Sequence, residues 1–308
     1  MELFLAAAIV SGTPLLFATV GELITEKAGN LNLGVEGMML MGACIGFLVG
    51  LSTGNPLLAL AGAALAGGGG ALIYAVITVT LRANQIVTGL TLTIFGTGFS
   101  RFVGQDMVGA VIPVELRTSF AKMNLPLLSD IPFFGPVFFR QDAFVYLGYV
   151  VAILAAIYLY RTRTGLNMRA VGENSAAADA SGIPISLYKY VHIILGGALC
   201  GLGGAYLSLV IVPIWQVDVV GGRGWIAVAL VIFASWNPIK ALFAAFLFGG
   251  LGILGLRLQS MGVHVSQYLV DMIPYIATIL IVIISTMRNR KEGMPPAGLG
   301  SAYFREER

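Results

Sequence analysis

The segment GLNMRAVGENSAAADASGI, Gly165 to Ile183, differs from most of the chain around it. It gathers charged and amide side chains, whereas only 11% of the 308 residues are charged and 57% are hydrophobic. A soluble globular chain has roughly 45–50% apolar and about 25% charged residues. This composition, together with a mean hydropathy of +0.89, predicts an integral membrane protein whose segment 165–183 lies outside the bilayer.

Nine stretches of the chain are apolar enough to be membrane spans, for which about twenty residues are needed. The shorter ones are expected to extend into their flanks or to be broken. Between the fourth and fifth, Asp106–Asp142 is cut by prolines, and we expect a long loop with surface or re-entrant helices. The predicted spans are Leu3–Gly21, Met38–Leu51, Pro56–Leu81, Ile86–Phe102, Ala143–Tyr160, Tyr190–Val212, Trp225–Trp236, Ala241–Leu256 and Tyr268–Met287.

The basic residues fall unevenly on the two sides of these spans. With nine spans the connections alternate, and twelve of the 18 basic residues lie on one side. Because positive charge accumulates on cytoplasmic connections, this side is predicted to be cytoplasmic, with the N-terminus outside and the tail 287–308 inside. The connection 161–189 is then cytoplasmic too, within a single transmembrane domain, 1–308. The twelve residues are Lys27, Arg82, Arg161, Arg163, Arg169, Lys189, Lys240, Arg288, Arg290, Lys291, Arg305 and Arg308.

Motifs for chemistry are missing from the sequence. It has no P-loop, no HExxH pair and no GxSxG elbow, which excludes ATP binding by a P-loop and argues against a metalloprotease. Cys44 and Cys200 lie singly in apolar runs and are expected to be small core residues. We expect no catalytic residue, no metal site and no cofactor in this chain. The net charge of +3 gives no reason to expect a nucleic-acid partner.

Within the connection 161–189, the stretch ENSAAADASG is predicted to form a short helix. Asn174 or Ser175 can cap its start, and Gly182 can end it. Two turns of alanine-rich helix are marginal in water. Such a helix therefore needs a surface to pack on, either the rest of this protein or a partner. A loop that caps itself is the alternative.

The stretch AGNLNLGVEG, Ala28 to Gly37, is polar and lies between the first two spans. Irregular backbone near membrane depth is tolerated only where protein or a water-filled cavity satisfies it. One interpretation is a broken helix that lines a translocation path with Asn30, Asn32 and Glu36. The other is an ordinary cytoplasmic turn with a capped helix start.

A second polar stripe begins the fourth span. Gln85, Thr88 and Thr91 recur at intervals of three, so they share one helical face. Neutral donors and acceptors on one face suit the passage of a polar, uncharged solute. The alternative for each threonine is a hydrogen bond to the preceding turn of its own helix.

Two of these stretches resemble a known family. Glu173 to Gly182 has the form E-x-x-x-A-A-x-x-x-G, which resembles the EAA-type signature in the coupling loop of ABC-importer permeases. The preceding GLNMRAVGEN and the upstream ITEKAGNLNLGVEGMMLMGA, Ile24 to Ala43, are more specific. Together they resemble the branched-chain amino acid/ribose permease superfamily, and within it most closely the nucleoside-type, basic membrane lipoprotein-dependent group. The resemblance runs over nearly the whole chain.

The resemblance implies an all-α, polytopic ABC-importer permease fold with a cytoplasmic coupling helix. Two permeases would form the path, and this chain resembles the shorter of a pair, so its partner would be a different, longer chain. A cytoplasmic ATPase subunit would bind ATP, and a solute-binding lipoprotein would deliver solute outside the bacterial inner membrane. The coupling role would fall on Gly165, Asn167, Arg169, Gly172, Glu173, Ala177, Ala178, Asp179 and Gly182.

The expected function is that of a permease subunit in an ATP-driven importer, which moves a polar uncharged solute, nucleosides in particular, inward by alternating access. The alternative class is a secondary transporter driven by an ion gradient. That class needs intramembrane carboxylates or broken helices arranged as inverted repeats, and the sequence shows no clear internal repeat.

Overall fold

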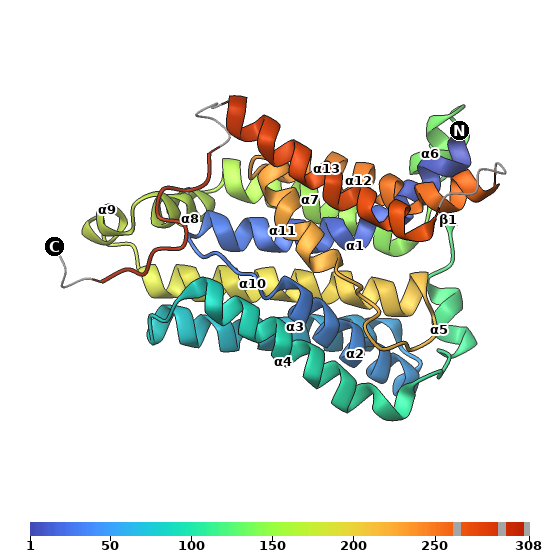
Figure 1. The fold of residues 1–308 in the computed structure, drawn as a ribbon, viewed down its shortest axis with the longest axis horizontal. Coiled ribbons are helices and arrows are strands. Elements are labelled where there is room, and N and C mark those ends of the chain that lie inside the picture. Colours follow the sequence, from blue (N-terminus) through green and yellow to red (C-terminus); the bar gives the residue numbers. More distant parts are fainter. Residues whose placement is uncertain (261–265, 289–293, 305–308) are drawn as a thin grey trace.

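The computed structural model describes residues 1–260, 266–288 and 294–304, which form a bundle of long helices (Figure 1). Two of these helices, α3 and α10, continue into π-helical turns, η1 and η3. The main elements are α1 (Glu2–Lys27), α2 (Val35–Thr53), α3 (Pro56–Ala75), η1 (Val76–Thr80), α4 (Gln85–Gly104), α7 (Ala143–Arg161), α8 (Arg163–Glu173), α9 (Ser175–Ala180), α10 (Ile185–Tyr206), η3 (Leu207–Ile211), α11 (Arg223–Phe233), α12 (Pro238–Ser260) and α13 (Gln267–Arg288).

Each of the predicted spans coincides with one of these helices. Among the described residues, seven helices are long and apolar enough to cross a membrane: α1, α2, α3 with η1, α4 with the turn after it, α7, α10 with η3, and α12. α11 has 11 residues and is about 16 Å long, roughly half of a hydrocarbon core. The predicted all-α, polytopic architecture is confirmed, whereas nine crossings and the side of each terminus stay predictions.

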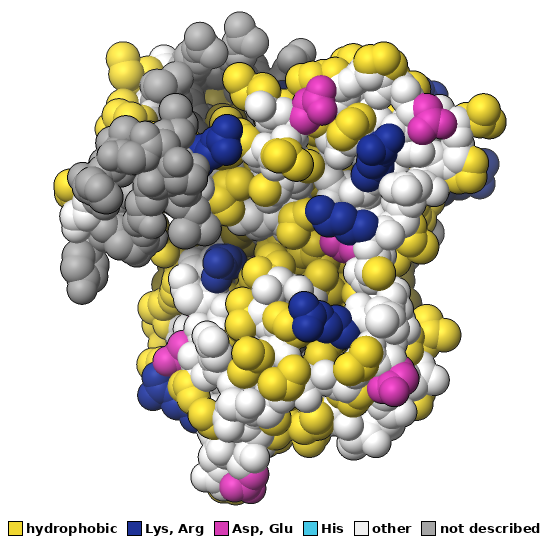
Figure 2. All heavy atoms as spheres, turned by 90° about the vertical axis from the view of Figure 1, so that its right-hand side faces the viewer, with side chains coloured by type: hydrophobic (Ala, Val, Ile, Leu, Met, Phe, Trp, Pro, Cys, Tyr) yellow, Lys and Arg dark blue, Asp and Glu magenta, His cyan; other side chains and the backbone are white. Residues whose placement is uncertain are grey.

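The predicted long loop between α4 and α7 contains only short elements. They are η2 (Gln105–Met107), α5 (Val114–Ser119), β1 (Met123–Asn124), α6 (Phe134–Phe138) and β2 (Arg140–Gln141), and the two strands pair antiparallel. Figure 1 places this loop at the end of the bundle opposite to α9. Viewed from that end, Lys, Arg, Asp and Glu side chains are spread over the face among apolar ones (Figure 2). This end is therefore suited to contact water.

The centre of the bundle is packed through small residues of α10. Gly201 and Gly42 lie so close that a Cβ on Gly42 would be 2.2 Å from the Gly201 Cα. A Cβ on Gly204 would be 1.9 Å from the carbonyl oxygen of Met39. Small residues allow helices to approach in this way inside membranes. Cys44 and Cys200 are buried and free, as the sequence predicted.

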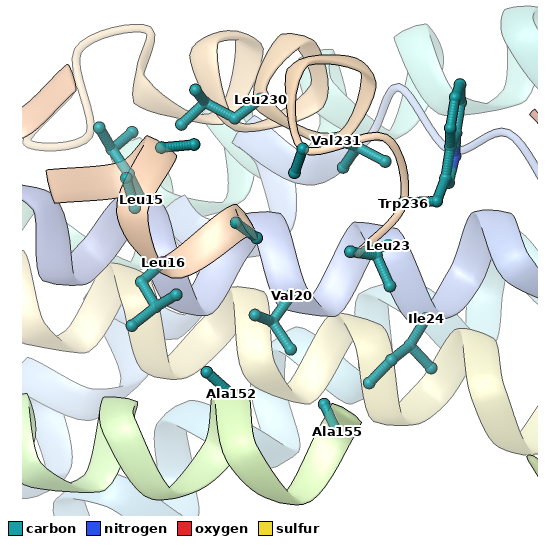
Figure 3. Packing of buried hydrophobic residues seen from close by; sticks show 14 of the residues in the cluster. Leu15, Leu16, Val20, Leu23, Ile24, Ala152, Ala155, Leu230, Val231 and Trp236 are labelled. Atoms are coloured by element: carbon teal, nitrogen blue, oxygen red, sulfur yellow. The ribbon is translucent and has the colours of Figure 1, made fainter. Parts of the chain in front are cut away.

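Around α1 the packing is made by larger apolar side chains (Figure 3). Leu16 and Val20 of α1 belong to one buried cluster with Ala152 of α7 and Leu230 of α11.

The helix α4 is much less covered by the rest of the chain. Only 28% of the residues in the α4 span are buried, against 72% for α2 and 67% for α10. The face of α4 that this chain leaves uncovered is therefore available to lipid or to another subunit.

Candidate coupling surface and solute path

The connection between α7 and α10 folds as two short helices, α8 and α9, at one end of the bundle (Figure 1). The hydroxyl of Thr162 caps α8 by accepting the N–H of Gly165 at 3.0 Å. The side-chain oxygen of Asn174 caps α9 by accepting the N–H of Ala177 at 3.0 Å. Gly182 then has a φ of +80°, a left-handed conformation that glycine adopts without strain. The predicted short helix, its cap and its end are confirmed.

The surface that α9 needs is supplied on one side by this chain. Ala178 is buried in a small cluster with Val171 of α8 and Ile185 of α10. Ala177 and Gly182, in contrast, are exposed. α9 is therefore held by its own protein on one face and presents the opposite face to its surroundings.

The predicted coupling residues of α8 mostly hold this helix in place. The Asn167 amide donates to the Tyr188 hydroxyl at 3.0 Å, and the Arg169 guanidinium lies 5.4 Å from the centre of the Tyr160 ring. Gly165 and Gly172 are buried, and a Cβ on Gly172 would be 2.2 Å from the carbonyl oxygen of Lys27. Their contacts fix α8 against α7, α10 and the end of α1.

Two predicted coupling residues contact the C-terminal segment, residues 294–304. A carboxylate oxygen of Glu173 accepts the N–H of Ala297 at 3.1 Å, and one of Asp179 accepts the hydroxyl of Tyr303 at 2.8 Å. Reasoning from the sequence also missed Leu166, whose side chain is 56% exposed on α8. The only signal for it was one leucine in the stretch GLNMRAVGEN, where Met168 and Val171 are apolar as well.

The stretch between α1 and α2 is held by side chains of this chain. The Leu31 N–H donates to Gln85 at 2.7 Å, the Asn32 N–H donates to Glu22 at 2.9 Å, and the Gly34 N–H donates to the Asn32 side chain at 2.8 Å. Asn30, Asn32 and Gln85 are all buried. The backbone N–H groups of this irregular stretch thus find hydrogen-bond acceptors inside the protein, as buried backbone groups must.

Glu36 connects the start of α2 to the start of α11. Its two carboxylate oxygens accept the N–H groups of Gly222 at 2.8 Å and Gly224 at 2.7 Å. These amides belong to the N-cap and the first turn of α11, where N–H groups lack intrahelical partners and favour negative charge. Figure 1 shows that α2 and α11 begin partway along the bundle. Two connections that enter the bundle, 28–34 and 212–222, therefore meet at Glu36.

Thr88 and Thr91 differ from the other predicted path residues. Their hydroxyls bond to the preceding turn, Thr88 to the Asn84 carbonyl and Thr91 to the Val87 carbonyl, each at 2.8 Å. Both also line a groove of about 270 Å³ between α3 and α4, and its other walls are mostly apolar: Ile73, Tyr74, Ile77, Val87, Leu92 and Phe95. Of the predicted path residues, these two border an open space, whereas Asn30, Asn32, Gln85 and Glu36 support the fold from inside.

Two buried carboxylates were not predicted. Glu22 and Glu26 are 0% and 2% exposed near the end of α1. Glu26 accepts the indole N–H of Trp236, while the second carboxylate oxygen of Glu22 has no hydrogen-bond partner among the described residues. The first span was predicted to end at Gly21, but α1 continues to Lys27 because its last turns pack inside the protein. Among the described residues, no three His, Cys, Asp or Glu side chains gather as metal ligands.

Residues 4–283 match the family model described as branched-chain amino acid transport system / permease component. The chain belongs to this family of ABC transporter permeases, and it is a multi-pass membrane transport subunit.

Three relatives match over most of their length. The putative glucose ABC transporter permease TsgC13 of Haloferax volcanii is 37% identical over 98% of this chain and 97% of its own. The nucleoside ABC transporter permease NupC of Lactococcus lactis is 35% identical over 92% of each chain. The guanosine ABC transporter permease NupQ of Bacillus subtilis is 32% identical over 91% of each. No solved structure matches the chain.

The relatives come in pairs. Bacillus subtilis has a second guanosine permease, NupP, which is 24% identical, and this chain matches 79% of its length. Lactococcus lactis has a second nucleoside permease, NupB, which is 25% identical, with 67% of its length matched. In each pair, the member with the higher sequence identity to this chain is also the one of which a larger share is matched: NupQ and NupC.

Proposed function

We propose that this chain is one of two permease subunits of an ATP-driven importer in the bacterial cytoplasmic membrane, and that the solute is a nucleoside. The observation that carries the proposal is the α8–α9 unit, which packs on its own bundle and exposes one face. Such a unit suits contact with a cytoplasmic ATPase. In this proposal residues 1–308 are one transmembrane domain, 161–189 is its cytoplasmic coupling loop and 287–308 a cytoplasmic tail.

The ATPase docks on the exposed face of α8 and α9. The methyl group of Ala177 and the bare backbone of Gly182 let another surface come close, and Leu166 supplies an apolar contact. Asn167, Arg169 and Gly172 act behind this face by fixing α8 on the bundle. ATP is bound by the ATPase subunit, and this chain needs no cofactor.

The solute path runs beside α4, between this chain and its partner permease. Thr88 and Thr91 border the groove there and offer neutral polar groups to a sugar or a base. Four buried side chains shape the path indirectly, because they hold in place the two connections that enter the bundle. They are Asn30, Asn32, Gln85 and Glu36. The partner permease, a different and longer chain, covers the exposed face of α4.

The named substrates of the relatives support two solutes. NupC and NupQ are named for nucleosides and guanosine, and TsgC13 is named for glucose. Both kinds of molecule are polar and uncharged, so glucose is the second candidate. A solute-binding lipoprotein that delivers the solute outside would contribute much of the selectivity.

The test is uptake into proteoliposomes that contain both permeases and the ATPase. The binding lipoprotein is added to the outer solution together with the solute. Radiolabelled guanosine and glucose are compared with ATP, without ATP and with an imposed ion gradient. The proposal predicts guanosine uptake that needs ATP and the ATPase subunit. Uptake driven by an ion gradient without the ATPase would instead establish a secondary transporter.

A further inference from the structure

We propose that the C-terminal segment, residues 294–304, is part of the coupling apparatus, and that Tyr303 is a positioning residue for α9. This inference rests on the proposed function, because it assigns a role in transmitting ATPase movement.

The backbone of the C-terminal segment is bonded to two different connections. The N–H of Gly298 donates to the carbonyl of Gly172 at 2.9 Å, and the N–H of Gly300 donates to the carbonyl of Gly29 at 3.3 Å. A Cβ on Gly298 would lie 2.7 Å from the Gly172 oxygen, so the two backbones are in direct contact. The segment thereby joins the end of α8 to the stretch between α1 and α2.

Two aromatic side chains extend these contacts. The Tyr303 hydroxyl donates to Asp179 on α9 at 2.8 Å, and its ring packs beside the cluster formed by Val171 and Ala178. The Arg82 guanidinium, between η1 and α4, lies 4.7 Å from the centre of the Phe304 ring. The segment therefore also reaches the connection that leads into α4.

These contacts connect α9, which is too short to be stable alone, to other parts of the protein. α9 has six residues, and a helix of this length depends on tertiary contacts for its stability. A hydrogen bond to a charged group is among the stronger single contacts. Through Tyr303 and Gly300, a displacement of α9 reaches the α1–α2 stretch, and through Phe304 it reaches the start of α4, which borders the proposed path.

The carboxylates of Glu173 and Asp179 take a different role in this arrangement. Each accepts a hydrogen bond from the C-terminal segment of the same chain, from Ala297 and Tyr303 respectively. Their charges therefore position α9 and the end of α8 through the segment. Direct contact with the ATPase falls instead on the exposed small residues of α9.

The experiment uses the complete transporter with Tyr303→Phe, Asp179→Ala and the double variant. The matched control is Tyr146→Phe, which removes a hydroxyl that donates to the Met123 carbonyl at the opposite end of the bundle. Solute taken up per ATP hydrolysed and hydrogen exchange of the α9 amides are both measured. We expect uptake per ATP to fall about tenfold and exchange to rise about tenfold in each single variant, the factor for one charge-assisted hydrogen bond.

The double variant should show no further loss beyond Asp179→Ala, because Asp179→Ala already removes the hydrogen bond that Tyr303→Phe removes. Unchanged exchange and unchanged uptake per ATP in Tyr303→Phe would overturn the inference. Loss of ATPase co-purification with unchanged α9 exchange would also overturn it, since the segment would then bind the ATPase itself. A wild-type complex without ATP-driven uptake would instead contradict the proposed function.

Discussion

Two polar regions stand out in this apolar chain, and they use their polar groups in opposite ways. In the region where the 28–34 and 212–222 connections meet, side chains such as Asn32 and Glu36 are buried and bonded to backbone N–H groups of the same chain. In the α8–α9 unit, polar contacts fix one face and leave Ala177 and Gly182 exposed on the other. Similar sequence signals thus correspond to internal support in one place and to an accessible surface in the other.

Replacing Glu36 gives the strongest test of this difference between the two polar regions. Replacement by Ala leaves the buried N–H of Gly224 and the partly buried N–H of Gly222 without their acceptors. An unsatisfied buried group costs about 1–3 kcal/mol. We expect Glu36→Ala to lower stability by roughly 2–5 kcal/mol, seen as a large drop in melting temperature in detergent. Glu36→Gln, which keeps one acceptor, should lose less. Glu115→Ala on the exposed surface of α5 is the control and should melt like the wild type.

Asn32→Leu is expected to have the next largest effect. The Asn32 side chain accepts the N–H of Gly34 inside the protein, so its loss leaves a buried donor unsatisfied. The free energy of unfolding should fall by about 1–3 kcal/mol. Transport should fall only in proportion to the amount of folded protein. If Asn32→Leu melted normally and lost only transport, Asn32 would belong to the solute path and the division between the two regions would fail.

Ala177→Trp tests the opposite behaviour on α9. The side chain is exposed, and exposed substitutions usually change stability by less than about 0.5 kcal/mol. A bulky ring on a docking face should nevertheless weaken ATPase binding about tenfold or more, equivalent to about 1.4 kcal/mol. Co-purification of the ATPase subunit and the melting temperature are measured together. Normal ATPase binding by this variant would remove α9 from the contact.

Thr91→Val should give the smallest change. The two side chains have the same shape, and among the residues that the structure describes the Thr91 hydroxyl bonds only to the preceding turn. Stability should therefore change by less than about 0.5 kcal/mol. If the groove beside α4 borders the path, the KM for uptake should rise a few-fold, as expected for one lost hydrogen bond of about 1 kcal/mol. Thr118→Val on α5 is the matched control, because its exposed hydroxyl likewise donates to a carbonyl of the preceding turn, that of Glu115.

Much of the fold could be predicted because its signals are local. Apolar runs place the long helices, and the cap at Asn174 and the glycine at 182 define α9. The burial of Glu22 could not be predicted, since a carboxylate after an apolar run is equally typical of a helix end in water. It depends on the 28–34 stretch folding back to donate the Asn32 N–H to it.

The candidate site divides in the same way. The connection 161–189 and its helix α9 were predicted from the sequence, whereas α8 was not predicted as a helix. The distinction between inward and outward residues depends on packing against α7, α10 and the C-terminal segment. The partners of Gln85 and Glu36 lie 54 and 186 residues away in the sequence, respectively. Contacts between such distant residues leave no periodic pattern in a single sequence, so internal support and path lining could not be told apart.

The central claim is that the exposed face of α9 contacts an ATPase, and photo-crosslinking tests it directly. A photoreactive amino acid is placed at position 177 in the transporting complex, and a second version carries it at position 115, at the other end of the bundle. We predict an adduct with the ATPase subunit from position 177, altered in amount by ATP, and none from position 115. A complex that transports solute but gives no ATPase adduct from position 177 would contradict the account.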